Sequence, residues 1–95
     1  MFLIDINYIV PLVEVDKQLE SHQQYLQKYF DKGVFIVAGR KVPRMGGLIL
    51  ALADSKEAVE KIISEDPYHL HKVADIAVTE FLTQRFHAAL EPLLK

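Results

Sequence analysis

Two short apolar runs constrain the fold of this chain more than any other feature of its sequence. They are VFIVAG at residues 34–39 and GGLILALA at residues 46–53, and Gly and Pro residues flank them. Both are far shorter than the roughly 20 apolar residues that cross a bilayer, and their length favours strands over helices. A strand without polar alternation is covered on both faces of its sheet. We therefore expect a sheet with two covered faces and no membrane partner.

The first third of the chain predicts a strand followed by a helix. Apolar residues alternate over 2–10, which is the two-residue period of a strand, and Pro11 ends this pattern. Apolar residues then follow three- and four-residue steps over 15–30, which predicts an amphipathic helix. Asp16 is the expected N-cap of this helix, and Gly33 is expected to end it.

After the two apolar runs, the chain predicts a second helix and a last strand. The helix is expected over 54–65 with Asp54 as its cap, and alternation over 73–86 predicts the strand. The tail at 87–95 has room for a helical turn. This order of elements is the ferredoxin-like βαββαβ arrangement, an α+β fold with a four-stranded antiparallel sheet and two helices on one face. We expect one domain over residues 1–95.

A second copy of the chain is the simplest cover for the other face of this sheet. Two helices cover only one face, and 51% hydrophobic residues in a chain of 95 give more apolar surface than a small core hides. Pairing of two open faces about a two-fold axis buries that surface. We therefore predict a homodimer through the open sheet face.

Charge and residue usage exclude several classes of function. Eleven basic and thirteen acidic residues give a net charge of −2 and are mixed along the chain, so no nucleic-acid partner is expected. The chain has no cysteine, which excludes disulfides and thiolate chemistry. It has no glycine-rich nucleotide loop, and we expect no cofactor. Its first ten residues lack the pattern of a signal peptide, so a cytoplasmic location is expected.

His22 and Asp66 are the candidate catalytic residues. His22 lies on the apolar side of the first predicted helix, and Asp66 stands directly before Pro67, ahead of the last strand. Histidine is a natural general acid or base near neutral pH, and a carboxylate that accepts the imidazole N–H fixes its tautomer. The alternative is a packed histidine bonded to a backbone carbonyl, with Asp-Pro acting only as a turn former.

Four further residues are candidates for substrate binding. Arg40 and Arg44 lie between the two apolar runs, where a guanidinium can hold a carboxylate or phosphate, although a solvated loop is the simpler interpretation. Tyr68 follows the Asp-Pro pair and forms either a pocket wall or part of the core. Asn7 shares a face of the first strand with Asp5, which lines a cleft or dimer seam or else marks an exposed edge.

The HLH motif raises the question of a metal site. His69 and His71 present two imidazoles at a strand-like spacing, which chelates a metal when a third ligand is near. The sequence shows no such third ligand, so two surface histidines and no metal are expected.

The segments SHQQYLQKYFDKGVFIVAGR and SEDPYHLHKVADIAVTEF, in this order and spacing, resemble the YciI-like family, also called the YCII-related domain. The resemblance covers nearly the whole chain. It rests on the helix histidine His22 ahead of a strand ending in Ala38-Gly39, and on the Asp-Pro-aromatic motif at 66–68. It implies a ferredoxin-like fold of the dimeric α+β barrel superfamily, and an active-site His-Asp pair that maps to His22 and Asp66.

Two positions depart from the family pattern. The family often has Arg-Pro-Ala-His where this chain has Leu-Glu-Ser-His at 19–22, and it has proline where this chain has Arg40. Substrate contacts are therefore expected to differ from those of better-known relatives. The family includes a dehydrochlorinase that acts on a chlorinated aromatic diol, although most members have no established reaction.

Three functions are compatible with these residues. The first is a small enzyme in which a His-Asp pair performs general acid-base chemistry, in an elimination, isomerisation or hydrolysis of a small organic substrate. The second is a non-catalytic protein that binds a small ligand in the same cleft. The third is a structural dimer module, in which the pair only holds a helix on the sheet.

Overall fold

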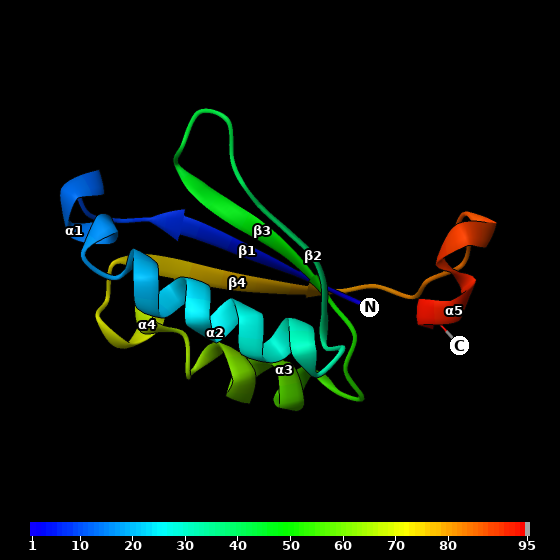
Figure 1. The fold of residues 1–95 in the computed structure, drawn as a ribbon. Helices are drawn as coiled ribbons and strands as arrows, with labels where there is room; N and C mark the ends of the chain where they lie inside the picture. The colour runs from blue at the N-terminus through cyan, green and yellow to red at the C-terminus, as the bar shows by residue number, and fades with distance from the viewer. Residues whose placement is uncertain (95) are drawn as a thin grey trace.

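Four strands form one antiparallel sheet in the computed structural model, which describes residues 1–94. The strand order is β2-β3-β1-β4, so the first and third strands occupy the centre (Figure 1). The bounds are β1 Phe2–Tyr8, β2 Phe35–Arg40, β3 Gly46–Ala51 and β4 Ala74–Glu80. This topology confirms the predicted ferredoxin-like α+β fold.

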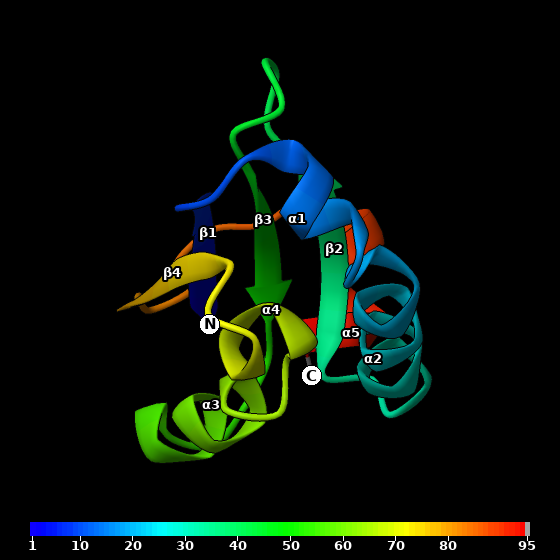
Figure 2. The same cartoon turned by 90° about the vertical axis from the view of Figure 1, so that its left-hand side faces the viewer.

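The two long helices pack under the same face of the sheet (Figures 1 and 2). They are α2 and α3, and the shorter α4 lies beside them while α1 lies at one end of the sheet. The bounds are α1 Leu12–Asp16, α2 Leu19–Asp31, α3 Lys56–Ile63, α4 Pro67–Leu70, the 3-10 turn η1 Ala88–Leu90 and α5 Glu91–Leu94. The prediction of two helices on one face is therefore confirmed.

Alternate residues of β1 form the centre of the core. The side chains of Phe2, Ile4 and Ile6 face the helices and are only 1–2% exposed. Ile4 lies between Ile49 of β3 and Val78 of β4 on the same face of the sheet. Burial of a large apolar side chain contributes about 1.5–3 kcal/mol to folding, so this strip fixes the register of β1.

The helix expected over 15–30 is in fact two helices, and the prediction of Asp16 as its N-cap was wrong. α1 begins directly after Pro11, whose φ of −57° suits the start of a helix. Lys17 and Gln18 separate α1 from α2, and Asp16 is the last residue of α1. The three- and four-residue steps continue across the break because both helices bury residues against one core.

Two further boundaries differ from the sequence prediction. Ser55 caps α3 by accepting a hydrogen bond from the backbone N–H of Ala58, in place of the expected Asp54. The Asp-Pro pair does not form a simple turn but begins α4, with Asp66 as its N-cap and Pro67 in its first turn. Proline suits that position because its fixed φ and missing N–H cost nothing there.

The last strand is shorter than the alternation over 73–86 predicts. β4 ends at Glu80 because its antiparallel partner β1 begins at Phe2, the residue opposite Glu80, and the final backbone hydrogen bond runs from the Phe81 N–H to the Met1 carbonyl. Residues 82–87 have no regular structure, and the tail extends from the body of the molecule (Figure 1). The predicted helical turn of the tail is confirmed by η1 and α5. Within residues 1–94, no helix has the length and apolar character needed to cross a membrane.

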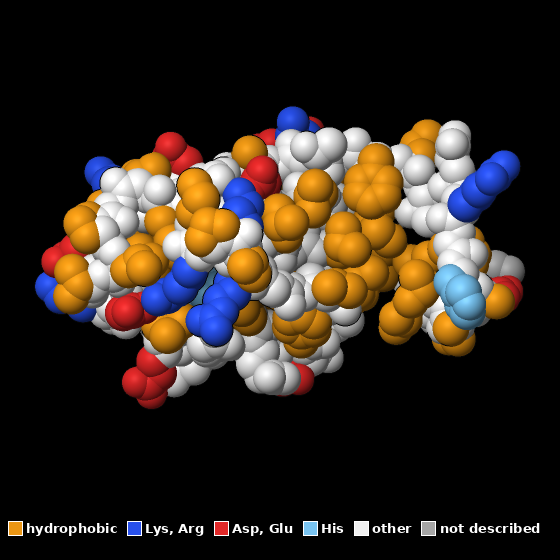
Figure 3. Space-filling model, turned by 90° about the horizontal axis from the view of Figure 1, so that it is seen from above, with side chains coloured by type: hydrophobic (Ala, Val, Ile, Leu, Met, Phe, Trp, Pro, Cys, Tyr) orange, Lys and Arg blue, Asp and Glu red, His pale blue; other side chains and the backbone are white. Residues whose placement is uncertain are grey.

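The sheet face away from the helices is uncovered in a single chain. Val37 and Leu48 on this side are 55% and 42% exposed. Figure 3 views the molecule from this side, and apolar side chains are spread over much of it. Asn7 and Asp5 also lie here, where the Lys41 ammonium is 2.7 Å from an oxygen of each. The described part of the chain therefore does not supply the second cover that the apolar runs predict.

Candidate active site

His22 and Asp66 meet between α2 and the N-terminus of α4. The His22 Nδ1 atom lies 2.8 Å from Asp66 Oδ1, and the two side chains are 8% and 2% exposed. The same carboxylate oxygen accepts the backbone N–H of Tyr68 at 2.9 Å, which is the N-cap bond of α4. The cap therefore fixes the carboxylate in the position that receives the imidazole.

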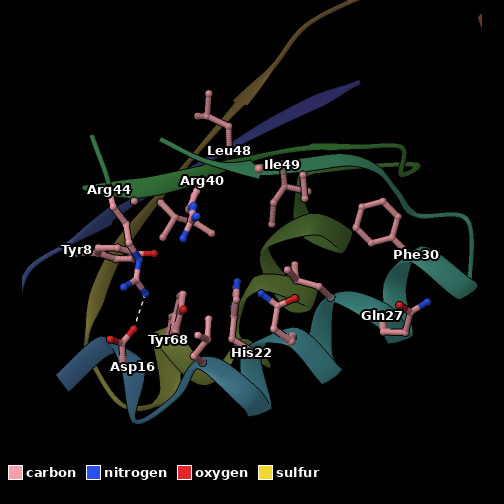
Figure 4. A pocket seen from close by; sticks show the side chains of 18 residues that line it. Tyr8, Asp16, His22, Gln27, Phe30, Arg40, Arg44, Leu48, Ile49 and Tyr68 are labelled. Atoms are coloured by element: carbon pink, nitrogen blue, oxygen red, sulfur yellow. Dashed lines mark hydrogen bonds and ion pairs between the residues drawn. The ribbon is translucent and has the colours of Figure 1, made fainter. Parts of the chain in front are cut away.

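The Asp66 contact leaves the far nitrogen of His22 free to act on a ligand. A carboxylate only accepts hydrogen bonds, so Nδ1 is the donor, and Nε2 of the neutral ring is an acceptor. No described residue forms a hydrogen bond with Nε2. Every fully buried side-chain nitrogen or oxygen of the described residues has a hydrogen-bond partner, so Nε2 is not fully buried. Nε2 is therefore accessible, and Figure 4 shows the His22 ring directed from α2 toward a cavity.

Tyr68 supports the His22 ring from its face. The two rings are nearly parallel, with an interplanar angle of 7° and centroids 3.8 Å apart. Tyr8 meets Tyr68 edge-on at 5.8 Å, which completes an aromatic wall. Burial raises the pKa of Tyr68, so its hydroxyl stays protonated over the physiological range.

A cavity of about 590 Å³ lies between the sheet and α2, with His22 in its wall. This volume lies within the range of sites for small organic ligands, about 300–1,000 Å³. Phe30 and Ile49 give one end apolar surface, with Gln27 beside Phe30, while the other end carries charged side chains (Figure 4). The cavity thus offers a flat ligand an apolar end, a proton-transfer group at the middle and a polar end.

The polar end is formed by Arg40, Arg44 and Asp16. Arg44 donates through Nη2 to Asp16 Oδ1 at 2.5 Å, and this bond holds the pKa of the Asp16 carboxyl below its usual range. The Arg44 guanidinium also lies over the Tyr8 ring, 5.8 Å from its centroid. No described residue forms an ion pair with Arg40. This end of the cavity therefore has one paired and one unpaired cation.

The structure brings together most of the residues that the sequence singles out. His22, Tyr68, Arg40 and Arg44 line one cavity, and Asp66 lies behind His22. Asn7 does not line it, because its side chain is on the open face of the sheet and bonds to Lys41.

His69 and His71 belong to α4 and its C-terminal cap, so their expected strand-like spacing was wrong. Across residues 1–94, the structure contains no group of three His, Cys, Asp or Glu side chains able to hold a metal ion.

Several cavity residues were not identified as site residues from the sequence. Tyr8 shares the core face of β1 with Ile6, so its alternation was a usable signal. Gln23 and Gln27 lie one turn apart on α2 beside His22, and their helical spacing gave the same kind of signal. Asp16 gave no such signal, because its position depends on the break between α1 and α2.

Comparison with known proteins places the chain in a family. Residues 1–82 match the model of the YCII-related domain. This chain belongs to the YCII-related domain family. The resemblance carried by the His22 and Asp66 segments is thereby confirmed. The tail from 83 onward lies outside the matched part of this YCII-related domain.

A solved structure with the same fold supports the architecture. This YCII-related domain is similar to 5-chloro-2-hydroxyhydroquinone dehydrochlorinase, TftG, from Burkholderia phenoliruptrix AC1100, in complex with 2,5-dihydroxybenzoquinone. The TM-score is 0.66 at 19% identity, and the match covers 86% of this chain and 94% of the other. At this identity the likeness establishes the fold alone. No curated protein matches this YCII-related domain.

Proposed function

We propose that this YCII-related domain is a small-molecule enzyme in which His22 transfers a proton through Nε2 and Asp66 orients its ring. The observation that supports the proposal is the 2.8 Å bond from Nδ1 to Asp66, combined with the free Nε2 on the cavity side. A base whose tautomer is fixed needs no cofactor and no separate nucleophile for proton transfer. Tyr68, Arg40 and Arg44 are the proposed substrate contacts.

Elimination from a hydroxylated aromatic ring is the reaction we favour among those open to one proton-transfer group. TftG has the same fold and is a dehydrochlorinase that holds a dihydroxybenzoquinone. Loss of hydrogen chloride removes one proton, which His22 Nε2 would accept, and one chloride, which would leave as the anion. The parallel His22 and Tyr68 rings and the apolar end of the cavity suit a flat ring.

A homodimer through the open sheet face completes the proposal. The exposed Val37 and Leu48 side chains lie on that face, and the helices cover the other. Burial of such a face against its own copy forms a closed, two-fold assembly, which is the commonest form of homo-oligomer. This arrangement leaves the cavity of each subunit, on the helix side, with its own His22.

The test is turnover by the purified protein and by two histidine variants. Chloride release from 5-chloro-2-hydroxyhydroquinone is measured, together with deuterium uptake by a panel of polyhydroxylated rings in D₂O. His22→Gln is expected to lower the rate about 10²- to 10⁴-fold, as for loss of a general base. His71→Gln is the matched control, because His71 is exposed and outside the cavity, and it should keep the wild-type rate.

The proposal fails in either of two results. One is a His22→Gln variant that folds normally and keeps the wild-type rate of chloride release or deuterium uptake. The other is a wild-type protein that binds these rings and neither converts them nor exchanges their protons, which would indicate a binding protein.

A further inference from the structure

Asp16 and Arg44 close the polar end of the cavity from two separate elements. Asp16 is the last residue of α1, and Arg44 lies in the loop between β2 and β3, 28 positions later in the chain. Figure 4 shows their bond at the end of the cavity beside Tyr8, with both side chains in its wall. The Asp16 side chain is 49% exposed and that of Arg44 is 24% exposed, so solvent and ligand reach both.

The charges at this end do not cancel. Arg40 and Arg44 contribute two cations, and Asp16 contributes one anion. The Asp66 carboxylate does not line the cavity, since it is 2% exposed and lies behind His22. One positive charge is therefore uncompensated, and it lies on Arg40, which has no ion pair with any described residue.

We propose that this end of the cavity binds a carboxylate of the substrate between Arg40 and Arg44, and that Asp16 determines specificity by competing with that carboxylate for Arg44. The inference rests on the proposed function, because the bound carboxylate places the ring of the substrate beside His22. A guanidinium has donors for two acceptors at once, so the ligand either shares Arg44 with Asp16 or displaces it. Like charges on Asp16 and the ligand then oppose each other across the same guanidinium.

Removal of the Asp16 charge is the direct test. Asp16→Asn keeps an oxygen acceptor for Arg44 and removes the negative charge. Glu14→Gln is the matched control, because Glu14 is on the same helix and outside the cavity, and among the described residues its carboxylate bonds only to Lys17. Asp16→Ser is a second variant without the charge, and circular dichroism melts establish that each variant is folded.

Two probes separate the effect of a carboxylate from that of the ring. They are 2,5-dihydroxybenzoate and hydroquinone, which share a ring and differ in one carboxylate, and their Kd values are measured by calorimetry. The wild type should bind the benzoate more tightly than hydroquinone. Asp16→Asn and Asp16→Ser should tighten benzoate binding about tenfold and change hydroquinone binding less than about twofold. Arg44→Gln should weaken benzoate binding by about tenfold or more, and Glu14→Gln should change neither Kd.

Three results would overturn this assignment. In the first, the benzoate binds no more tightly than hydroquinone, or does not bind. In the second, Asp16→Asn leaves benzoate binding unchanged or weakens it, which would show that the ion pair only holds α1 to the loop between β2 and β3. In the third, Glu14→Gln tightens benzoate binding as much as Asp16→Asn does. The turnover test of His22 is separate, because an inactive dyad does not alter these Kd differences.

Discussion

Tyr68 lies flat against His22, with ring centroids 3.8 Å apart, while Asp66, two residues earlier, binds the edge of the same imidazole. One short segment at the start of α4 thus fixes both the tilt and the rotation of the histidine ring. A general base acts efficiently only when its geometry is held close to the reacting atom. The stacking of these two rings is therefore as much a part of the proposed site as the bond to the carboxylate.

Two substitutions of Tyr68 should distinguish the contribution of its ring to the rate from the contribution of its hydroxyl. Tyr68→Phe keeps the flat surface, and we expect the rate of proton transfer to stay within a few-fold of the wild type. Tyr68→Leu removes that surface and allows the His22 ring to tilt, which should lower the rate about tenfold or more. Deuterium uptake by a bound ring compound measures both. Equal rates in the two variants would show that the stack does not position His22.

Replacement of Asp66 should affect stability through two bonds. Asp66→Ala removes the cap of α4 and leaves the buried Nδ1–H of His22 without an acceptor. We expect the free energy of unfolding to fall by about 2–4 kcal/mol, from about 1 for the cap and about 1–3 for the orphaned donor. Asp66→Asn keeps an N-cap oxygen and should cost clearly less. Urea denaturation at neutral pH measures both, and equal losses would contradict the cap assignment.

The sequence was enough to predict the order of strands and helices, because buried strips such as Phe2, Ile4 and Ile6 repeat every second residue. It was also enough to select His22 and Asp66, since an apolar helix face and a fixed Asp-Pro pair are local features. These two residues are 44 positions apart, and only the packing of α2 against α4 brings them to 2.8 Å.

The position of Asp16 could not be predicted in the same way. Its role depends on where α1 ends and on how the loop before β3 places Arg44, neither of which periodicity encodes. Arg40 was predicted as a candidate substrate contact in the loop between the two apolar runs, whereas the structure places it as the last residue of β2, where it lines the cavity. Its side chain shares the core face of the sheet because the bulge between Phe35 and Val37 resets the alternation of that strand.

Tyr29 and Glu65 should give stability a dependence on pH. The Tyr29 hydroxyl donates to Glu65 at 2.7 Å. Burial and this bond raise the pKa of Tyr29 from 10.0 to about 12, and the bond lowers the pKa of Glu65. The stabilisation linked to the raised pKa of Tyr29 is fully present below about pH 10 and is lost as the pH rises from about 10 to 12. The stabilisation linked to the lowered pKa of Glu65 is present above about pH 4.5 and is lost as the pH falls below that value.

The variant Tyr29→Phe isolates this dependence from that of the other tyrosines. The difference in unfolding free energy between wild type and Tyr29→Phe should be constant from pH 6 to 9. It should shrink between about pH 10 and 12, and also below about pH 4.5. Urea denaturation across this range checks the prediction. A difference that does not vary with pH would show that the bond is absent in solution.

The open sheet face should control assembly. A charge at its centre, as in Leu48→Asp or Val37→Asp, would be buried without a partner in the proposed dimer, which is strongly unfavourable. We expect these variants to be monomers and the wild type to be a dimer by light scattering after gel filtration. Leu70→Asp is the control, because Leu70 is 61% exposed on α4, on the helix side. A monomeric wild type, or a dimeric Leu48→Asp, would contradict the interface.

The central claim is that Nε2 of His22 is the atom that meets the substrate, and a crystal structure with 2,5-dihydroxybenzoquinone tests it most directly. The proposal predicts the quinone in the cavity beside Tyr68, with one of its atoms about 2.6–3.2 Å from His22 Nε2. His22 Nδ1 should remain bonded to Asp66 in that complex. A quinone bound elsewhere, or an Nε2 atom bonded to the protein and out of reach of the ligand, would contradict the claim.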